Sequence, residues 1–209
     1  MRAVPTGGAG RDCRAWPPRP ARTFWARSSD AVPTVFTHAV AALALGPSVQ
    51  RTARPLRLWA LGAACAVVPD LDVVAFRLGI PYEHPLGHRG FSHSLVFAAV
   101  LAAVVVAVFF RRSAHRAALG AYFFAATASH GLLDMLTDGG HGVALLAPFS
   151  NARQFFPWRP IEVSPIGIDG FLSARGLEVL ASEVLWVWGP ALAVAAVLLA
   201  ARRRAPQEV

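Results

Sequence analysis

Four stretches of the chain place histidines and aspartates inside or beside strongly apolar segments. Histidine nitrogens and carboxylate oxygens are ligands of divalent transition metals, and apolar segments rarely hold several such groups without a use. We therefore predict a metal site, which we expect to be hydrolytic. Its candidate metal ligands are His38, Asp70, Asp72, His88, His93, His130 and Asp134.

The spacing within two of these stretches favours a shared ion. His130 and Asp134 are four residues apart, so on a helix they lie on one face, one turn apart. Pro69 is expected to end a helix, after which Asp70 and Asp72 follow within an apolar segment. An ionised Asp inside a membrane helix costs roughly 2.5 to 3.5 kcal/mol. A divalent cation would offset that cost by supplying the opposite charge.

His88 and His93 flank the sequence Arg-Gly-Phe-Ser. We expect Gly90 to allow a turn there and Ser92 to cap the helix that follows. We treat the remaining histidines of the apolar part of the chain as ordinary residues; they are His84, His115 and His141.

The mixture of imidazole and carboxylate predicts which metal would bind. It suits zinc best, with manganese or iron as alternatives, whereas calcium and magnesium prefer oxygen ligands. Because seven candidates exceed one tetrahedral shell, we expect one ion or two, with Asp70 or Asp72 as the bridge of a pair. An uncoordinated member of the set, or Asp138, would act as general base. The predicted catalytic residues are Asp70, Asp72 and Asp138.

Each stretch taken alone also has a non-catalytic explanation. The His130 and Asp134 pair is typical of a hydrogen bond between helices, one Asp of the second stretch could cap a helix, and His38 could be a core histidine. One shared site explains all four stretches together. The alternatives that stay open are a structural metal site, a polar network that packs helices, and an ion transporter.

The composition indicates a membrane protein. Of 209 residues, 55% are hydrophobic and 15% are charged, which lies on the membrane side of ordinary soluble proteins. Cys13 and Cys65 form neither a disulfide framework nor a metal motif. The formal net charge is +8, but every basic residue is Arg and these are scattered over loops, so we expect no direct nucleic-acid partner.

Five apolar segments must position the candidate ligands, and we place them at 34–46, 58–78, 92–110, 117–136 and 184–201. A soluble helical bundle would also contain helices that are apolar all round. Lengths near 20 residues, and arginines at the segment ends, favour membrane spans, although the first segment is short. We therefore predict an all-α integral membrane bundle of about four to five transmembrane helices, with the His/Asp site at one end.

The domain organisation follows from the same pattern. Residues 1–31 are rich in Pro, Gly and Arg and lack the apolar run of a signal peptide. We expect a disordered extension, or a start assigned too early, and favour the second alternative, with the natural start near Val32. Residues 32–204 are the predicted membrane domain, with a loop from Gly139 to Glu183 that holds a short interfacial helix. Residues 205–209 are a short tail.

The arginine clusters predict an orientation. They fall at segment ends that five alternating helices bring to one face, and they comprise Arg51, Arg54, Arg57, Arg111, Arg112, Arg116, Arg202, Arg203 and Arg204. By the positive-inside rule this face is cytoplasmic, and the candidate ligands fall at the opposite ends. We therefore expect a multi-pass protein of the cytoplasmic (inner) membrane whose site faces the non-cytoplasmic side. Other arginines weigh against this orientation: Arg77, Arg89, Arg153, Arg159 and Arg175.

The motifs resemble those of the YdjM-like family of LexA-binding, inner-membrane-associated predicted metal-dependent hydrolases. The resemblance spans about Pro33 to Ile168 and is carried by Thr37-His38, Pro69-Asp70-Leu71-Asp72, the run from His88 to Ser94, and Ser129-His130 through Asp134. It implies an integral membrane protein with a metal-dependent hydrolase site, distantly similar to the zinc phospholipase C and P1-nuclease group. The long basic N-terminus departs from the family, and LexA binding does not transfer from the family's name.

The expected substrate is a phosphoester or a lipid-linked molecule, which metal-activated water would hydrolyse. The predicted substrate-binding residues are Arg89, Arg153 and Arg159, because a guanidinium group matches the oxygens of a phosphate. Anchoring of these arginines at lipid headgroups is an equal alternative. Membrane lipid is the expected partner, and the sequence identifies no protein partner.

Overall fold

The computed structural model describes residues 34–49, 55–163 and 174–204, and within these ranges the chain is helical. Isolated bridges, Thr137 to Ile161 and Val143 to Gln154, are the β pairings of the described residues. The elements are α1 (Val35–Leu45), η2 (Gly46–Ser48), α2 (Pro55–Val67), η3 (Val68–Val73), α3 (Val74–Arg77), η4 (Phe91–His93), α4 (Leu95–Phe109), α5 (Arg116–Met135), α7 (Ala174–Glu183), η5 (Val184–Trp188) and α8 (Gly189–Arg204). The predicted all-α bundle is confirmed.

Some predicted features lie outside the described residues. They are the extension 1–31, the tail 205–209, Arg51 and Arg54. The domain boundaries that were drawn from composition therefore remain predictions.

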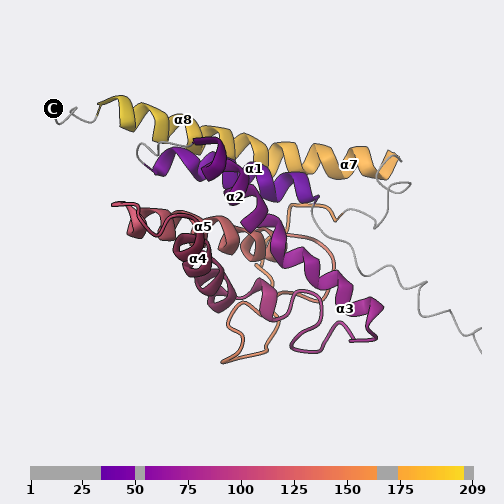
Figure 1. The fold of residues 1–209 in the computed structure, drawn as a ribbon. Helices are drawn as coiled ribbons and strands as arrows, with labels where there is room; N and C mark the ends of the chain where they lie inside the picture. Colours follow the sequence, from indigo (N-terminus) through magenta and orange to yellow (C-terminus); the bar gives the residue numbers. More distant parts are fainter. Residues whose placement is uncertain (1–33, 50–54, 164–173, 205–209) are drawn as a thin grey trace, which may run out of the picture.

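Helix α5 is the centre of the bundle and packs against α1, α2 and α4. Helix α1 also packs against α8. Figure 1 shows α7 and α8 as one long rod along the side of the bundle next to α1, while the loops that follow α3 and α5 gather on the opposite side. The site residues thus come from helices that meet around α5.

Small residues let α1, α2 and α5 approach closely. Ala42, Ala66 and Ala126, one from each helix, form a fully buried cluster. A Cβ atom on Gly62 would lie 1.9 Å from the Tyr122 hydroxyl oxygen, so any larger residue would have to displace the Tyr122 ring. Tyr122 donates from its hydroxyl to the carbonyl oxygen of Ala42 across 3.3 Å. Small residues are the usual means by which membrane helices pack closely.

This alanine layer sets the position of the candidate ligands. His38, Asp70 and His130 are each four residues from an alanine of the layer, which is one helical turn. Because the three helices touch at the alanine layer, the side chains of His38, Asp70 and His130, one turn away from it, lie close to one another.

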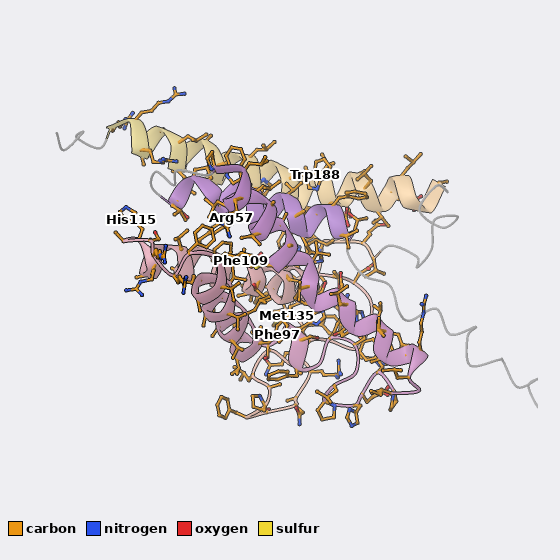
Figure 2. The ribbon with its side chains drawn as sticks, viewed as in Figure 1. Arg57, Phe97, Phe109, His115, Met135 and Trp188 are labelled. Atoms are coloured by element: carbon orange, nitrogen blue, oxygen red, sulfur yellow. The ribbon has the colours of Figure 1, made fainter. Side chains whose placement is uncertain are left out.

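The arginine-rich ends of the helices lie away from that space. The Arg57 guanidinium lies over the Phe109 ring, 5.1 Å from its centroid, which joins the start of α2 to the end of α4. Figure 2 shows Arg57 and His115 toward one end of the bundle, with Met135 at the other end of α5. Helix α8 also ends toward that side in Figure 1, with Arg202, Arg203 and Arg204 in its last turn.

Two continuous helical stretches of the described chain are long and apolar enough to cross a membrane: Pro55–Arg77, with 23 residues, and Gly176–Arg204, with 29. Only 6% of the apolar window of the second stretch is buried. A helix at the core of a soluble protein would be largely covered, so this exposed apolar rod fits contact with lipid. Helices α1 and α4 are apolar but shorter.

One local prediction was wrong, and the extent of the C-terminal helix differs from the predicted apolar segment. Ser94 caps α4, since its hydroxyl accepts from the Phe97 amide across 3.1 Å, whereas Ser92 lies in η4 and contacts a candidate ligand. Helix α7 is continuous with η5 and α8, so the C-terminal helix starts ten residues before the predicted apolar segment. Helix α7 mixes charged and apolar residues, as is typical of a half-exposed helix, so hydropathy did not mark it as part of the last apolar segment.

Candidate metal centre

Four side chains from three elements converge. Asp70 lies in η3, His93 ends η4, and His130 and Asp134 lie on α5, and their ligand atoms are all within 4.8 Å of one another. Nε2 of His130 is 3.0 Å from Nε2 of His93 and 3.3 Å from Asp70 Oδ1. Nε2 of His93 is 3.2 Å from Asp134 Oδ2. Donors bound tetrahedrally to zinc are about 3.4 Å apart, so this group, the tetrad, has the size of one coordination shell.

The contacts of the other ring nitrogens favour one tautomer of each neutral histidine. His130 Nδ1 lies 2.7 Å from the carbonyl oxygen of Ala66, and His93 Nδ1 lies 3.1 Å from Asp72 Oδ2. A carbonyl and a carboxylate only accept hydrogen bonds, so each Nδ1 carries the proton. In the neutral rings both Nε2 lone pairs therefore point into the tetrad. Metal-binding histidines are oriented in the same way, by a hydrogen bond from the opposite nitrogen.

His38 adds a fifth candidate ligand. Its ring stacks on His130 with centroids 3.7 Å apart, and its Nε2 lies 3.7 Å from Asp134 Oδ1. The side chain is fully buried, and neither ring nitrogen has a hydrogen-bond partner within the described part of the chain. Burying two unpaired ring nitrogens is costly, and a nearby cation would remove part of that cost.

Asp72 contacts the rings of both His88 and His93. Its Oδ1 lies 2.6 Å from His88 Nδ1, and its Oδ2 accepts from the Arg89 amide across 3.2 Å, in addition to the contact with His93. The Ser92 hydroxyl donates to the same oxygen. Asp72, His88 and His93 form a second group that could hold an ion. Because both oxygens of Asp72 already accept hydrogen bonds, orientation of the histidines explains its surroundings equally well.

Arg89 is buried beside the tetrad. Its Nε lies 3.2 Å from Asp134 Oδ2, and its terminal nitrogen donates to the carbonyl oxygen of Gly139 and to the Thr137 hydroxyl. The backbone φ of Arg89 is +58°, so Arg89, and not the neighbouring Gly90, adopts the left-handed conformation in this turn. A Cβ atom on Gly90 would lie 2.3 Å from the carbonyl oxygen of Pro85, so glycine is needed there for close approach.

The charges of the cluster fit a divalent ion. Three carboxylates, those of Asp70, Asp72 and Asp134, face one guanidinium group, that of Arg89, which leaves two negative charges when the histidines are neutral. The oxygens of Asp70 and Asp134 are buried and accept no well-aligned hydrogen bond in the described residues, so their close contacts are with Arg89 and with the ring nitrogens of the histidines. Buried charges are otherwise neutralised by pairing or by a metal, so the residues present fit a divalent cation.

The other predicted site residues lie outside the tetrad. Asp138 is exposed and accepts from the Val163 amide across 3.0 Å. Arg159 is also exposed and lies over the Phe155 ring. Arg153 donates to the carbonyl oxygens of His88 (2.9 Å) and Tyr82 (2.5 Å), so it ties two loops together. The roles of Asp138 in catalysis and of these arginines in substrate binding stay predictions.

Two further features surround the site. Burial raises the pKa of Tyr82 above its ordinary value, so the phenol stays protonated; its oxygen lies 3.3 Å from the His141 amide. The predicted ordinary histidines, His84, His115 and His141, belong to neither metal-binding group of the described residues.

Sequence reasoning missed a buried cluster on the other side of α1. Glu183 is fully buried and accepts hydrogen bonds from the Thr34 amide and from the hydroxyls of Thr34 and Thr37. Trp188 donates from its indole nitrogen to Thr37. An acidic residue just before the last apolar segment was the signal that could have revealed it.

Comparisons with known proteins agree with the motifs. The family model described as YdjM inner membrane protein matches residues 33–205. The inner membrane protein YbcI of Escherichia coli (strain K12) is 39% identical over 175 residues, an alignment that covers 82% of this chain and 100% of the relative. No solved structure matches the chain. The family match and the apolar helices support an inner-membrane location.

Proposed function

The chain belongs to the YdjM family of inner membrane proteins, and on this basis we propose that it is a metal-dependent hydrolase embedded in that membrane. The observation that carries the proposal is the convergence of two Nε2 lone pairs and two carboxylates, with each Nδ1 proton tied to an acceptor on the outside. A polar network that only packs helices would need a proton on one Nε2 to pair these groups, so the presence or absence of a bound metal separates the two explanations.

The proposed centre binds one ion, with zinc as the preferred metal and manganese or iron as alternatives. Its ligands are Asp70, His93, His130 and Asp134, and His38 is placed to join them. We propose that Asp72 and His88 do not bind the ion but support the ligands, because Asp72 contacts His93 Nδ1 and so orients its ring. A second ion on the group of Asp72, His88 and His93 is the alternative.

Asp70, His93, His130 and Asp134 would hold a divalent ion, which when bound would supply Lewis acidity for the activation of water and of a phosphoester. The protein's part is to hold the ligands. Arg89 fixes one oxygen of Asp134, and the Ala66 carbonyl oxygen fixes the ring of His130. Asp70 is 8% exposed whereas His38, His130 and Asp134 are fully buried, so we place the water and the substrate on the Asp70 side. The oxygen of Asp70 that is not a ligand would accept the proton.

The proposed substrate is a phosphoester or a lipid-linked molecule at the membrane surface. Large apolar side chains are exposed on the loops at the site end, including Leu86 at 58%, Phe149 at 87% and Trp158 at 58%. Such residues suit the boundary between lipid and water, where Arg159 could contact a phosphate. This location brings the tetrad close to headgroups.

We propose a multi-pass topology with the site on the non-cytoplasmic side. The support is that Arg57 and the last turn of α8 lie toward the end of the bundle away from Met135 and the candidate ligands. By the positive-inside rule the arginine-rich end is cytoplasmic.

Metal analysis combined with hydrolysis tests the proposal. The purified protein is assayed for bound metal and for cleavage of chromogenic and phospholipid phosphodiesters, beside Asp70→Ala, His93→Ala and, as a matched control, His115→Ala. His115 is exposed at the opposite end of the bundle. The proposal predicts metal and activity in the wild type and control and their loss in the two site variants. Metal without hydrolysis would favour a structural centre, and a folded wild type without metal would contradict the proposal.

A further inference from the structure

We infer that the buried cluster of Glu183, Thr37 and Trp188 is a positioning device that sets His38 as a ligand of the metal centre. The inference rests on the proposed metal site and assigns to the C-terminal helix a part in it. None of these three residues touches the tetrad directly among the contacts described above. They act through α1, which carries His38.

The ring of His38 is held by packing and by a 3.7 Å contact between its Nε2 and Asp134 Oδ1, and not by a hydrogen bond. It stacks on His130, but its two nitrogens have no hydrogen-bond partner within the described residues. His93 and His130 differ, because a hydrogen bond at Nδ1 holds each ring. Without a hydrogen bond at either nitrogen, the placement of the buried ring depends on packing and on the backbone of α1, and hence also on what fixes the first turn of that helix.

Glu183 fixes that turn. Its carboxylate accepts from the Thr34 amide at 2.6 Å, the Thr34 hydroxyl at 2.7 Å and the Thr37 hydroxyl at 2.8 Å. Thr34 is the N-cap residue of α1 but its side chain makes no capping hydrogen bond, and the Glu183 carboxylate from another helix accepts from one backbone amide at this end, that of Thr34. A negative charge at a helix N-terminus is also favoured by the helix dipole. Thr37 immediately precedes His38.

The geometry of η5 completes the device. Trp188 donates from Nε1 to the Thr37 hydroxyl across 2.8 Å, so Thr37 is held by two residues of the C-terminal helix that are five positions apart. In an α-helix residues five apart point about 140° away from each other. The segment Val184–Trp188 is a π-helix, in which hydrogen bonds run from i to i+5 and residues five apart return to the same side.

This π turn explains how Glu183 and Trp188 both reach Thr37. π turns inside α-helices are rare and occur often at functional sites. Figure 2 shows Trp188 where the C-terminal rod passes α1, in agreement with the contacts of α1 with α8 and η5. The C-terminal helix is therefore more than a lipid-facing anchor, because it sets the register of the helix that carries His38.

The test compares zinc affinity, by competition with a chelator, and the visible spectrum of the cobalt-loaded full-length protein. The variants are Thr37→Val, which keeps the shape but removes the hydroxyl, Thr37→Ser, which restores it, and Trp188→Phe, which removes the indole donor. His38→Ala is the reference for a lost ligand. Leu185→Ala is the matched control, since Leu185 lies in the same π turn and is 63% exposed.

The inference predicts that Thr37→Val lowers zinc affinity about 10- to 100-fold, as is usual for residues behind a ligand, and changes the cobalt spectrum as His38→Ala does. Thr37→Ser and Leu185→Ala should behave as the wild type. In combination with His38→Ala, Thr37→Val should add little, because both remove the same ligand. Trp188→Phe should change the cobalt spectrum in the same direction as Thr37→Val. This second variant tests the inference if Thr37→Val does not fold.

Two outcomes would overturn the inference alone: wild-type zinc affinity in Thr37→Val and Trp188→Phe, or losses that multiply with that of His38→Ala. A folded wild-type protein that binds neither zinc nor cobalt would instead overturn the proposed function, and the positioning role would fall with it. The two failures are therefore distinguishable in one set of measurements.

Discussion

The Nε2 atoms of His93 and His130 face each other across 3.0 Å, and the opposite nitrogen of each ring is tied to an acceptor. Two lone pairs held at this distance repel unless a cation or a proton lies between them. The carboxylates of Asp70 and Asp134 border the same space. A proton would relieve the repulsion between the nitrogens alone, whereas a divalent ion would also balance the two carboxylates, and for this reason we propose a metal ion.

Replacement of Asp70 by Asn tests the ligand assignment with a side chain of the same shape. The change removes the charge of a ligand whose two oxygens have no hydrogen-bond partner in the described residues. We expect zinc affinity to fall by more than about 100-fold, above the 10- to 100-fold typical of residues behind a ligand. Chelator competition measures the change, and unchanged affinity would remove Asp70 from the ligand set.

Replacement of Asp72 by Asn separates orientation from ligation. Asn keeps one oxygen acceptor but cannot accept from every donor that Asp72 now serves. We expect zinc affinity to fall by about 10- to 100-fold while the stoichiometry stays at one ion. Metal analysis at saturating zinc decides the point: two ions in the wild type and one in the variant would support the two-ion alternative.

Removal of the metal should lower the stability of the fold. Stripping the ion leaves two uncompensated charges and the buried nitrogens of His38. Restoring zinc at 1,000 times its dissociation constant should stabilise the protein by about 4 kcal/mol. Unfolding in detergent, with and without chelator, measures this difference. The Asp70→Asn variant is the control, and its transition should respond little to zinc.

The helix contact beneath the site predicts a mutational effect at Gly62. A Cβ atom there would clash with the Tyr122 hydroxyl, so Gly62→Ala should destabilise the protein by about 1–3 kcal/mol and separate α2 from α5. Gly120→Ala is the matched control, because nothing lies within 4 Å of its Cβ position in α5. Alanine should stabilise that helix by roughly 0.5–1 kcal/mol. Equal stability in both variants would argue against the close packing.

Much of this arrangement could be predicted from the sequence. The four-residue spacing of His130 and Asp134 and the helix break at Pro69 indicated elements that the structure contains. The prediction that distant stretches meet also agrees with the structure, because ligand types in apolar segments are costly when they are isolated. Helical spacing predicted the elements, and the presence of ligand-type residues in apolar segments predicted that they meet.

The partners of each side chain could not be predicted in the same way. Ser92 and Ser94 are both suitable caps, and only the turn at Arg89 directs Ser92 to Asp72 instead. The pairing of Arg89 with Asp134 is another contact that the sequence pattern does not reveal, and the substrate-binding role of Arg89 stays a prediction. The contact of Glu183 with Thr37 joins residues 146 positions apart, a separation at which sequence pattern says nothing about pairing.

Labelling of single cysteines tests the proposed orientation. In a chain whose Cys13 and Cys65 are replaced by Ala, Leu86→Cys should react with an impermeant reagent added from the non-cytoplasmic side. Arg203→Cys should react only after the membrane is opened. Both positions are exposed in the structure. The reverse pattern would place the site on the cytoplasmic side without affecting the metal assignment.

The most direct test of the central claim is the zinc content of the purified protein and of a His93→Ala/His130→Ala variant, each loaded with zinc and freed of excess ion. The account predicts one tightly bound ion per wild-type chain, with X-ray absorption showing mixed imidazole and carboxylate ligands, and none in the variant. A folded wild-type protein without zinc, manganese or iron, or a variant that retains the wild-type content, would contradict it.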